Sequence, residues 1–237
     1  MADAAMGGMK GTALHLFRGL ARSYDLAVDL ATLFQDRYWK QWAVEKAIPT
    51  EAGLTLDVGC GTLLLEERYG GGGRSFVGLD LTGEMIRAGQ SKKVPNVVLL
   101  IRGDAESLPF PDGAFDSVVS CYVAKYVNMD ALAGELARVT KPGASVVLYD
   151  FARPRGPLAP FIEIYIQGGM RVIGFLMRLA GSPEAFTFGN LPRIVDRTTW
   201  DMEVAARMEE LGFDTVAAER LTGGVVFAYC GKKPGSP

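Results

Sequence analysis

The most restrictive feature of this sequence is a short apolar segment that runs directly into closely spaced glycines and then into a helical pattern. Leu54–Val58 is predicted to be a buried strand, and Gly59-Cys60-Gly61 follows it without a spacer. Glycines at such a turn let the backbone bend sharply and approach a ligand closely. Thr62 is placed to cap a helix over 63–69. A strand, a glycine turn and a helix in this order are typical of ligand-binding α/β folds.

The alternation of strand and helix continues along the chain. Four more strands are predicted, over Ser75–Leu79, Val97–Ile101, Phe115–Cys121 and Ala144–Tyr149. Helices are predicted between them, from the capping residue Thr82 to about Lys92 and over Asp130–Thr140, the latter ended by Lys141-Pro142-Gly143. Strands that alternate with helices favour a parallel sheet with right-handed crossovers.

The C-terminal part changes the pattern. A helix over Trp200–Leu211 is followed by two strands, Phe213–Leu221 and Val225–Cys230, around the turn Thr222-Gly223-Gly224. That spacing predicts a hairpin on the sheet edge. The expected fold class is therefore α/β: a Rossmann-like, seven-stranded, mostly parallel sheet with an antiparallel C-terminal hairpin strand, helices on both faces and an N-terminal helical segment.

The whole chain, 1–237, is predicted to be a single domain. Residues 14–47 form one or two amphipathic helices, with Ser23 or Asp25 as the start of the second. The sheet core covers 54–151, a helical insertion covers about 157–199, and the C-terminal helix and hairpin cover 200–231.

Composition excludes several classes. The net charge of −2 lacks the basic excess of most nucleic-acid-binding proteins. The three cysteines and one histidine, His15, provide neither a zinc ligand set nor a disulfide framework, and His15 is assigned to packing or the surface. No signal peptide is recognised, and Pro157–Ala180 contains Glu163 and two arginines, which argues against a membrane span. We expect a reduced, cytoplasmic protein without a metal.

Asp80 stands at the end of the second predicted strand, next to the glycine turn in a parallel sheet. An acidic side chain at this place accepts hydrogen bonds from both hydroxyls of a ribose. Leu63 and Leu64 occupy positions at which a pyrophosphate-binding turn needs glycine. The loop therefore favours S-adenosylmethionine (SAM) over a nicotinamide dinucleotide.

The chain resembles class I SAM-dependent methyltransferases and, more narrowly, the ubiquinone/menaquinone biosynthesis C-methyltransferase family, over nearly its whole length. The SAM motifs, shared by many methyltransferases, include Gly103-Asp104-Ala105-Glu106 and Leu108-Pro109-Phe110 after the third strand. The segments more specific to the family are the two ends. The N-terminal one is Phe17–Trp42, with Tyr24-Asp25 and Arg37-Tyr38-Trp39-Lys40, and the C-terminal one runs from Gly212-Phe213 through Val225-Val226. The family's motifs are also matched by Gly78–Met85, Arg138-Val139, Lys141-Pro142-Gly143 and Asp150–Pro154.

The resemblance implies a set of SAM contacts. Asp57, Asp80 and Asp104 are expected to bind the amino-acid, ribose and adenine portions, and Met85 to cover the adenine face. The full predicted cofactor-binding set is Asp57, Gly59, Gly61, Asp80, Leu81, Met85, Asp104, Ala105 and Cys121. The third family glycine is replaced by Leu63, which we expect to be tolerated.

A second departure concerns the acceptor. Where the family has an Arg-Asn pair after the fourth strand, this chain has Lys125-Tyr126. A cation beside a phenolic hydroxyl lowers the pKa of that hydroxyl and activates the neighbouring ring carbon. Lys125 and Tyr126 are therefore the candidate catalytic pair, although Lys does not offer the donor fork of Arg.

The resemblance implies a hydrophobic, quinol-like acceptor with a polyprenyl tail. The apolar segments 161–166 and 172–177 are equally suited to lining such a tail, to peripheral contact with the inner face of a membrane, to the core or to a homodimer face. Three rivals stay open: a methyltransferase for another small hydrophobic or phospholipid acceptor, a non-catalytic SAM-binding protein and a nicotinamide oxidoreductase. Nucleic acid is not an expected partner.

Overall fold

The computed structural model describes residues 10, 11, 13, 14, 17, 21, 24–47, 53–157, 159–179 and 193–235. Seven strands form one sheet in the order β3-β2-β1-β4-β5-β7-β6. Their bounds are β1 (Leu54–Val58), β2 (Ser75–Asp80), β3 (Val97–Arg102), β4 (Phe115–Cys121), β5 (Thr140–Phe151), β6 (Asp214–Leu221) and β7 (Val226–Lys232). Strands β1 to β5 run parallel, and β7 is antiparallel to both β5 and β6. This confirms the predicted mostly parallel sheet with a C-terminal hairpin at its edge.

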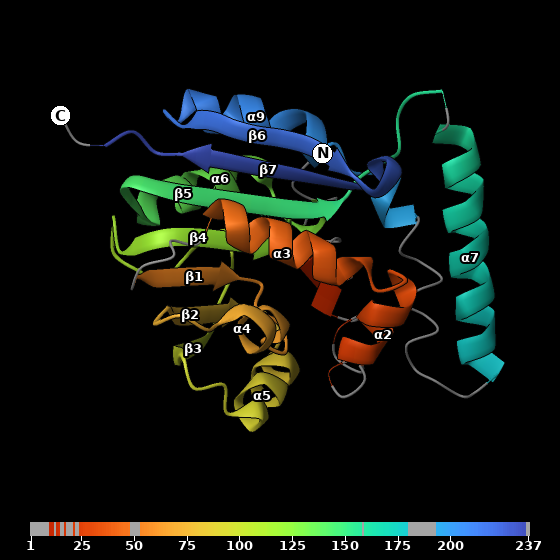
Figure 1. Cartoon of the computed structure of the whole chain (residues 1–237), viewed down its shortest axis with the longest axis horizontal. Coiled ribbons are helices and arrows are strands. Elements are labelled where there is room, and N and C mark those ends of the chain that lie inside the picture. Colours follow the sequence, from red (N-terminus) through yellow and green to blue (C-terminus); the bar gives the residue numbers. More distant parts are fainter. Residues whose placement is uncertain are drawn as a thin grey trace.

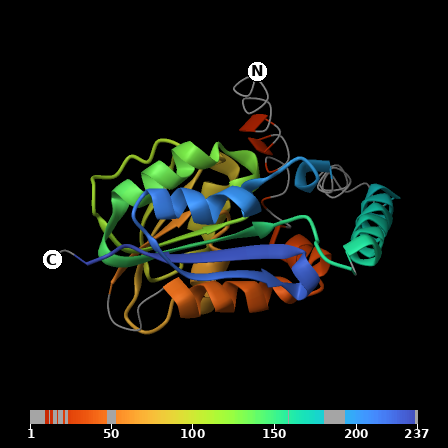
Figure 2. The same ribbon diagram turned by 90° about the horizontal axis from the view of Figure 1, so that it is seen from above.

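Helices cover both faces of the sheet, as predicted. Their bounds are α2 (Tyr24–Ala31), α3 (Gln35–Ala47), α4 (Leu64–Tyr69), α5 (Gly83–Lys92), α6 (Met129–Val139), α7 (Ala159–Leu179) and α9 (Trp200–Glu210), with 3₁₀ turns η1 (Ala124–Tyr126) and η2 (Thr222–Gly224). Figures 1 and 2 show α3 against one face, and α6 and α9 against the other. Helices α2 and α7 lie beyond the end of the sheet at which the parallel strands finish (Figure 1).

Burial along the strands follows from this layering. The inner strands β1, β2 and β4 are buried at nearly every position, because helices cover both of their faces. The edge strands β3 and β6 leave several positions exposed. One core joins the sheet to α6 and α9 through Leu132, Leu136, Val204 and Met208. The opposite core joins it to α3 through Trp39 and Trp42, among others.

Three local predictions differ from the structure. Thr62 does not cap α4: Leu63 precedes the helix with a positive φ of 64°, and the Thr62 hydroxyl donates to Asp25 instead. Thr82 stands at the N-cap of α5, but its hydroxyl donates to the Asp80 carboxylate. Strand β5 begins already at Thr140, so the Lys-Pro-Gly segment lies within it. His15 and residues 180–192 lie outside the described residues.

Candidate active site

The main cavity opens where β1, β2 and β4 end, which is the edge at which open α/β sheets bind ligands. It contains eight of the nine predicted cofactor-binding residues; the exception is Asp57. Its wall is completed by residues of the N-terminal segment and of the loop after β4. The lining residues outside the predicted cofactor set are Lys10, Ala13, Leu14, Phe17, Tyr24, Leu79, Thr82, Gly103, Tyr122, Val123, Tyr126 and Val127.

The glycine turn is held by two hydrogen bonds to one carbonyl. The backbone amides of Gly59 and Cys60 donate to the Leu79 oxygen at 2.7 and 3.1 Å. Gly59 has φ +82°, and a Cβ placed on it would lie 2.2 Å from a methyl carbon of Val123. Only glycine fits here, because both the backbone conformation and the contact with the loop after β4 exclude a side chain.

Asp80 is buried and accepts three hydrogen bonds. Its Oδ1 accepts from the backbone amide and the hydroxyl of Thr82 at 2.7 and 2.8 Å. Its Oδ2 accepts from the backbone amide of Gly61 at 3.0 Å. Burial raises the pKa of Asp80, and these donors oppose the rise. The carboxylate is thus fixed against the glycine turn, and Oδ2 keeps acceptor capacity toward the cavity.

Asp57 lies deeper, in a smaller hollow that adjoins the main cavity. The two hollows share Tyr24, Tyr122 and the glycine turn. The Asp57 side chain is fully buried, and Glu66 from α4 faces it. Burial raises the pKa of Asp57 to about 7, whereas Lys40 acts to lower it. Asp80 and Asp104 therefore line one hollow and Asp57 lines the adjoining one, and the glycine turn lies between them.

Asp104 stands at the outer rim of the cavity. Lys10 from the N-terminal segment donates to Asp104 Oδ2 at 2.8 Å and to Glu106 at 2.5 Å. Burial raises the pKa of Asp104, but the hydrogen bonds from Lys10 and the Glu106 amide outweigh it and hold the pKa below its usual range. Lys10 thereby pairs with two acids that follow β3 at the cavity rim, a contact that sequence reasoning did not foresee.

The remaining predicted contacts are apolar. Met85 of α5 is 2% exposed, and Ala105 and Cys121 are also buried. Burial raises the pKa of the Cys121 thiol well above its ordinary value, so this side chain acts as a small neutral group.

The predicted catalytic pair is divided between two environments. The Tyr126 ring lines the cavity, and burial raises the pKa of its hydroxyl. Lys125 is 2% exposed and does not line the cavity. Its ammonium donates to Asp150 Oδ1 at 2.6 Å and to the Tyr122 carbonyl at 2.9 Å. It also lies 4.4 Å from the centroid of the Tyr126 ring. Lys125 therefore contacts the back of Tyr126 rather than the open space.

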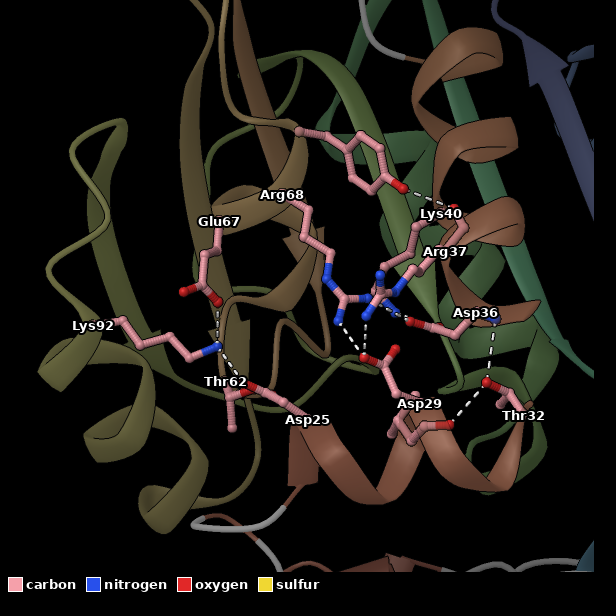
Figure 3. Close-up of polar contacts among 12 residues, drawn as sticks. Asp25, Asp29, Thr32, Asp36, Arg37, Lys40, Thr62, Glu67, Arg68 and Lys92 are labelled. Atoms are coloured by element: carbon pink, nitrogen blue, oxygen red, sulfur yellow. Dashed lines mark hydrogen bonds and ion pairs between the residues drawn. The ribbon is translucent and has the colours of Figure 1, made fainter. Parts of the chain in front are cut away.

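An ion-pair network fastens the N-terminal helices beside the site (Figure 3). Arg68 of α4 donates to Asp29 of α2 at 2.8 Å, and Arg37 of α3 donates to the same oxygen at 2.9 Å. Asp25 of α2 accepts from Lys92 of α5 at 2.6 Å. Because α4 follows the glycine turn directly, the network joins the turn to the segment that covers it.

The site prediction missed three aromatic lining residues, namely Phe17, Tyr24 and Tyr122. Tyr24 comes from α2 and touches both hollows, and Tyr122 follows β4 with a positive φ of 64°. The Tyr122 hydroxyl donates to Asp36 at 2.7 Å. The sequence signal for Tyr24 was the Tyr24-Asp25 pair, which belongs to the family-like N-terminal segment but was given no role in the predicted site.

Among the described residues, no helix has the length and apolarity that crossing a membrane requires. Within the same residues, no group of three or more His, Cys, Asp or Glu side chains is arranged to hold a metal ion.

Comparison with known proteins decides the family. The profile of the ubiE/COQ5 methyltransferase family matches residues 7–233. The chain belongs to this family. It is 33% identical over 220 residues to a demethylmenaquinone methyltransferase of Mycolicibacterium vanbaalenii, covering 92% of this chain and 93% of the relative. It is 34% identical over 223 residues to the demethylmenaquinone methyltransferase of Mycobacterium tuberculosis, covering 93% and 92%.

The fold has relatives of known structure. A chain of the Haloferax volcanii complex that contains the Trm112 methyltransferase activator matches with a TM-score of 0.64 at 16% identity, over 92% of this chain and 97% of that one. The molecule is thus a SAM-dependent methyltransferase with a Rossmann-like sheet.

Proposed function

We propose that this methyltransferase transfers the methyl group of SAM to a ring carbon of a demethylmenaquinol-type quinol. The observation that carries the proposal is that a single cavity joins the predicted SAM residues to an apolar wall made by Leu14, Phe17, Val123 and Val127. The names of the mycobacterial relatives support a demethylmenaquinol over a ubiquinol precursor. The other acceptor classes and a non-catalytic role receive no such support.

The residues at the strand ends fit SAM. Asp57 would face the amino-acid portion, Asp80 the ribose and Asp104 the adenine. The free acceptor capacity of Asp80 Oδ2 and the close-packed glycine turn at Gly59 are the features that such a nucleoside needs. When bound, SAM would supply an electrophilic methyl group on a positively charged sulfur, and this sulfur would leave as a neutral thioether when the S–CH3 bond breaks.

The protein's part is to hold the acceptor ring close to that methyl group and in line with the sulfur. Tyr126 is the member of the predicted pair that can touch the acceptor, because its ring lines the cavity. Lys125 acts on Tyr126 from behind and neutralises Asp150, so it is a positioning residue in this proposal. Its charge also favours ionisation of a phenolic hydroxyl held at Tyr126.

The decisive experiment is methyl transfer with purified protein. Reduced demethylmenaquinone and SAM should give a product heavier by one methyl group, measured by mass spectrometry of the extracted lipid. Tyr126→Phe should lower kcat more than it changes the KM for SAM. A quinol that returns unmethylated, alongside a protein that binds SAM, would remove the acceptor assignment and leave the methyltransferase class intact.

We also propose that the enzyme meets its acceptor at a membrane surface. Large apolar side chains are exposed at spacings of three, eight and three residues on α7, and others are exposed on α2. They are Phe161, Ile164, Val172 and Phe175 on α7, and Leu26 and Leu30 on α2, with Leu33 in the turn that follows α2. Both helices lie at the end of the sheet where the cavity opens (Figure 1). An amphipathic helix of this kind inserts its apolar face into the headgroup region.

Sedimentation with vesicles of anionic and zwitterionic phospholipid tests this surface. The double variant Phe161→Ser/Phe175→Ser should bind vesicles more weakly and keep its activity on a short-tailed, water-soluble quinol. Met202→Ser, at an exposed apolar position of α9, serves as the matched control. Equal vesicle binding by both variants would remove the membrane contact.

A further inference from the structure

Two carboxyl groups are buried against each other behind the glycine turn. Asp57 near the end of β1 is 2% exposed, and Glu66 in the first turn of α4 is 1% exposed. Oδ1 of Asp57 and both carboxyl oxygens of Glu66 are buried and have no hydrogen-bond partner within the described ranges. A buried carboxylate without a partner is costly, so such oxygens call for a proton or a cation.

The surrounding charges do not satisfy the pair. Lys40 of α3 acts favourably on both carboxyl groups. Its ammonium, however, already donates to Asp36 Oδ1 at 2.5 Å. On the other side, Asp80 of β2 adds a like charge that acts on Asp57. One shared cation therefore faces several carboxylates, and Asp57 and Glu66 remain undercompensated.

Protonation is the alternative way to neutralise them. Burial raises the pKa of Asp57 to about 7 and raises the pKa of Glu66 well above its ordinary value, with Asp57 as the next cause. The thiol of Cys60 lies near both acids and that of Cys121 near Asp57, and burial raises the pKa of both thiols, so neither adds a charge near neutral pH. Two acids in contact at this depth favour a state in which they share one proton.

A cationic ligand group can reach this place. Asp57 lines the smaller hollow, which shares Gly59, Gly61 and Cys121 with the main cavity. The amino-acid portion of SAM carries an α-ammonium, and Asp57 is the residue predicted to face that portion. Asp57 thus stands where the proposed cofactor has its positive nitrogen, and Glu66, which lines neither hollow, lies behind it.

We propose that Glu66 completes the ammonium subsite with Asp57, and that a single proton held between the two carboxyl groups in the free enzyme is replaced by the ammonium of the cofactor. This inference rests on the proposed SAM site. The proton passes to solvent, and both carboxylates then face one positive charge. Glu66 is a positioning residue here: it acts through Asp57 and sets the proton content of the site.

Isothermal titration calorimetry near pH 7, in buffers of different ionisation enthalpy, tests the exchange. S-adenosylhomocysteine, which has the ammonium but no transferable methyl group, should release about one proton on binding to the wild type. 5′-Methylthioadenosine, which lacks the amino-acid portion, should bind without releasing it. Equal proton release with the two ligands would overturn the proposal, and so would none with either; neither result depends on a variant.

Variants then assign the effect to Glu66. Glu66→Gln should still bind S-adenosylhomocysteine, but proton release should fall close to zero and the affinity should no longer rise between pH 6 and pH 8. The ligand's own amino group contributes equally to both proteins and cancels in the difference. Glu67→Gln is the matched control, because Glu67 is half exposed and pairs with Lys92; it should behave as the wild type does.

The outcomes separate the two proposals. Unchanged proton release and unchanged affinity in Glu66→Gln would mean that Glu66 is a permanently protonated structural group. That result would overturn this inference and leave the proposed SAM site intact. A wild type that binds neither ligand would overturn the SAM site and the inference together.

Discussion

Two buried acidic sites, at the ends of β1 and β5 on either side of β4, are built in opposite ways. At the end of β5, Asp150 receives the ammonium of Lys125 at 2.6 Å and the backbone amides of Lys125 and Phe151. At the end of β1, Asp57 faces another acid, Glu66, and its Oδ1 has no hydrogen-bond partner among the described residues. Both aspartates are fully enclosed, so the difference lies in their partners and not in their burial.

The difference separates structure from function. A compensated buried acid fixes the local backbone and leaves little for a ligand to do. An uncompensated one lowers stability unless a proton or a ligand completes it, which is typical of binding sites. On this reasoning Asp150 belongs to the scaffold that holds η1, and we assign Asp57 to the proposed cofactor site.

The largest effect on stability should come from removing the cation that compensates Asp150, which leaves this site uncompensated like that of Asp57. Lys125→Met leaves Asp150 buried without its cation and should lower the free energy of unfolding by about 3–5 kcal/mol, measured by urea denaturation. The exposed pair of Lys141 with Asp116 is the control, and Lys141→Met should cost less than about 1 kcal/mol. Similar losses in both variants would contradict the distinction.

Asp80 lies between the two cases, because three neutral donors compensate it rather than a charge. Asp80→Asn removes the charge that the ribose hydroxyls would meet. Binding of S-adenosylhomocysteine should weaken by about 10- to 100-fold, as for the loss of a hydrogen bond to a charged group. Calorimetry checks this, and unchanged affinity would place the ribose elsewhere.

The uncompensated pair of Asp57 and Glu66 should make the free energy of unfolding depend on pH. The pKa of Asp57 is about 7 in the folded protein and about 3.9 in an unfolded chain. Between these values the folded state binds more protons, so the free energy of unfolding falls as pH rises, by at most about 1.4 kcal/mol per pH unit for one proton. Urea midpoints from pH 4.5 to pH 7.5 should fall less steeply in Glu66→Gln. Parallel curves would show that the pair is ionised throughout.

The smallest effect is expected for a half-exposed pair. Lys92 bridges Asp25 and Glu67 at 2.6 and 2.7 Å near the surface. Lys92→Met should cost about 0.5–1 kcal/mol, and less at high salt, because solvent screens such pairs. Thermal unfolding at 50 mM and 500 mM salt checks this. A loss as large as that of Lys125→Met would mean that exposure does not govern these pairs.

Most of the fold was predictable because it depends on local patterns. The buried runs at 54–58 and 115–121 match β1 and β4, and the Thr222-Gly223-Gly224 turn marks the hairpin. One of the errors occurs where a side chain has a tertiary partner. Threonine is a residue type that often caps helices, but the Thr62 hydroxyl donates a hydrogen bond to Asp25 instead, and no local sequence pattern indicates that contact.

The site was predictable in part for the same reason. The acids and glycines at strand ends follow from topology, and eight of the nine line one cavity. The covering residues Lys10 and Tyr24 come from a segment whose position depends on long-range ion pairs. The partner of Lys125 is Asp150, whose role required knowing that β4 and β5 are neighbours. Glu66 carries no motif and is revealed only by its burial.

The contact between Gly59 and Val123 couples the shape of the proposed cofactor side of the cavity to that of the acceptor side. Because no room exists between the turn that follows β1 and the loop that follows β4, a bulkier residue at 123 would push on the methyl-donor side as well as on the acceptor side. Engineering this protein toward new acceptors should therefore begin at Phe17 or Val127, where the cavity wall can change without shifting the turn.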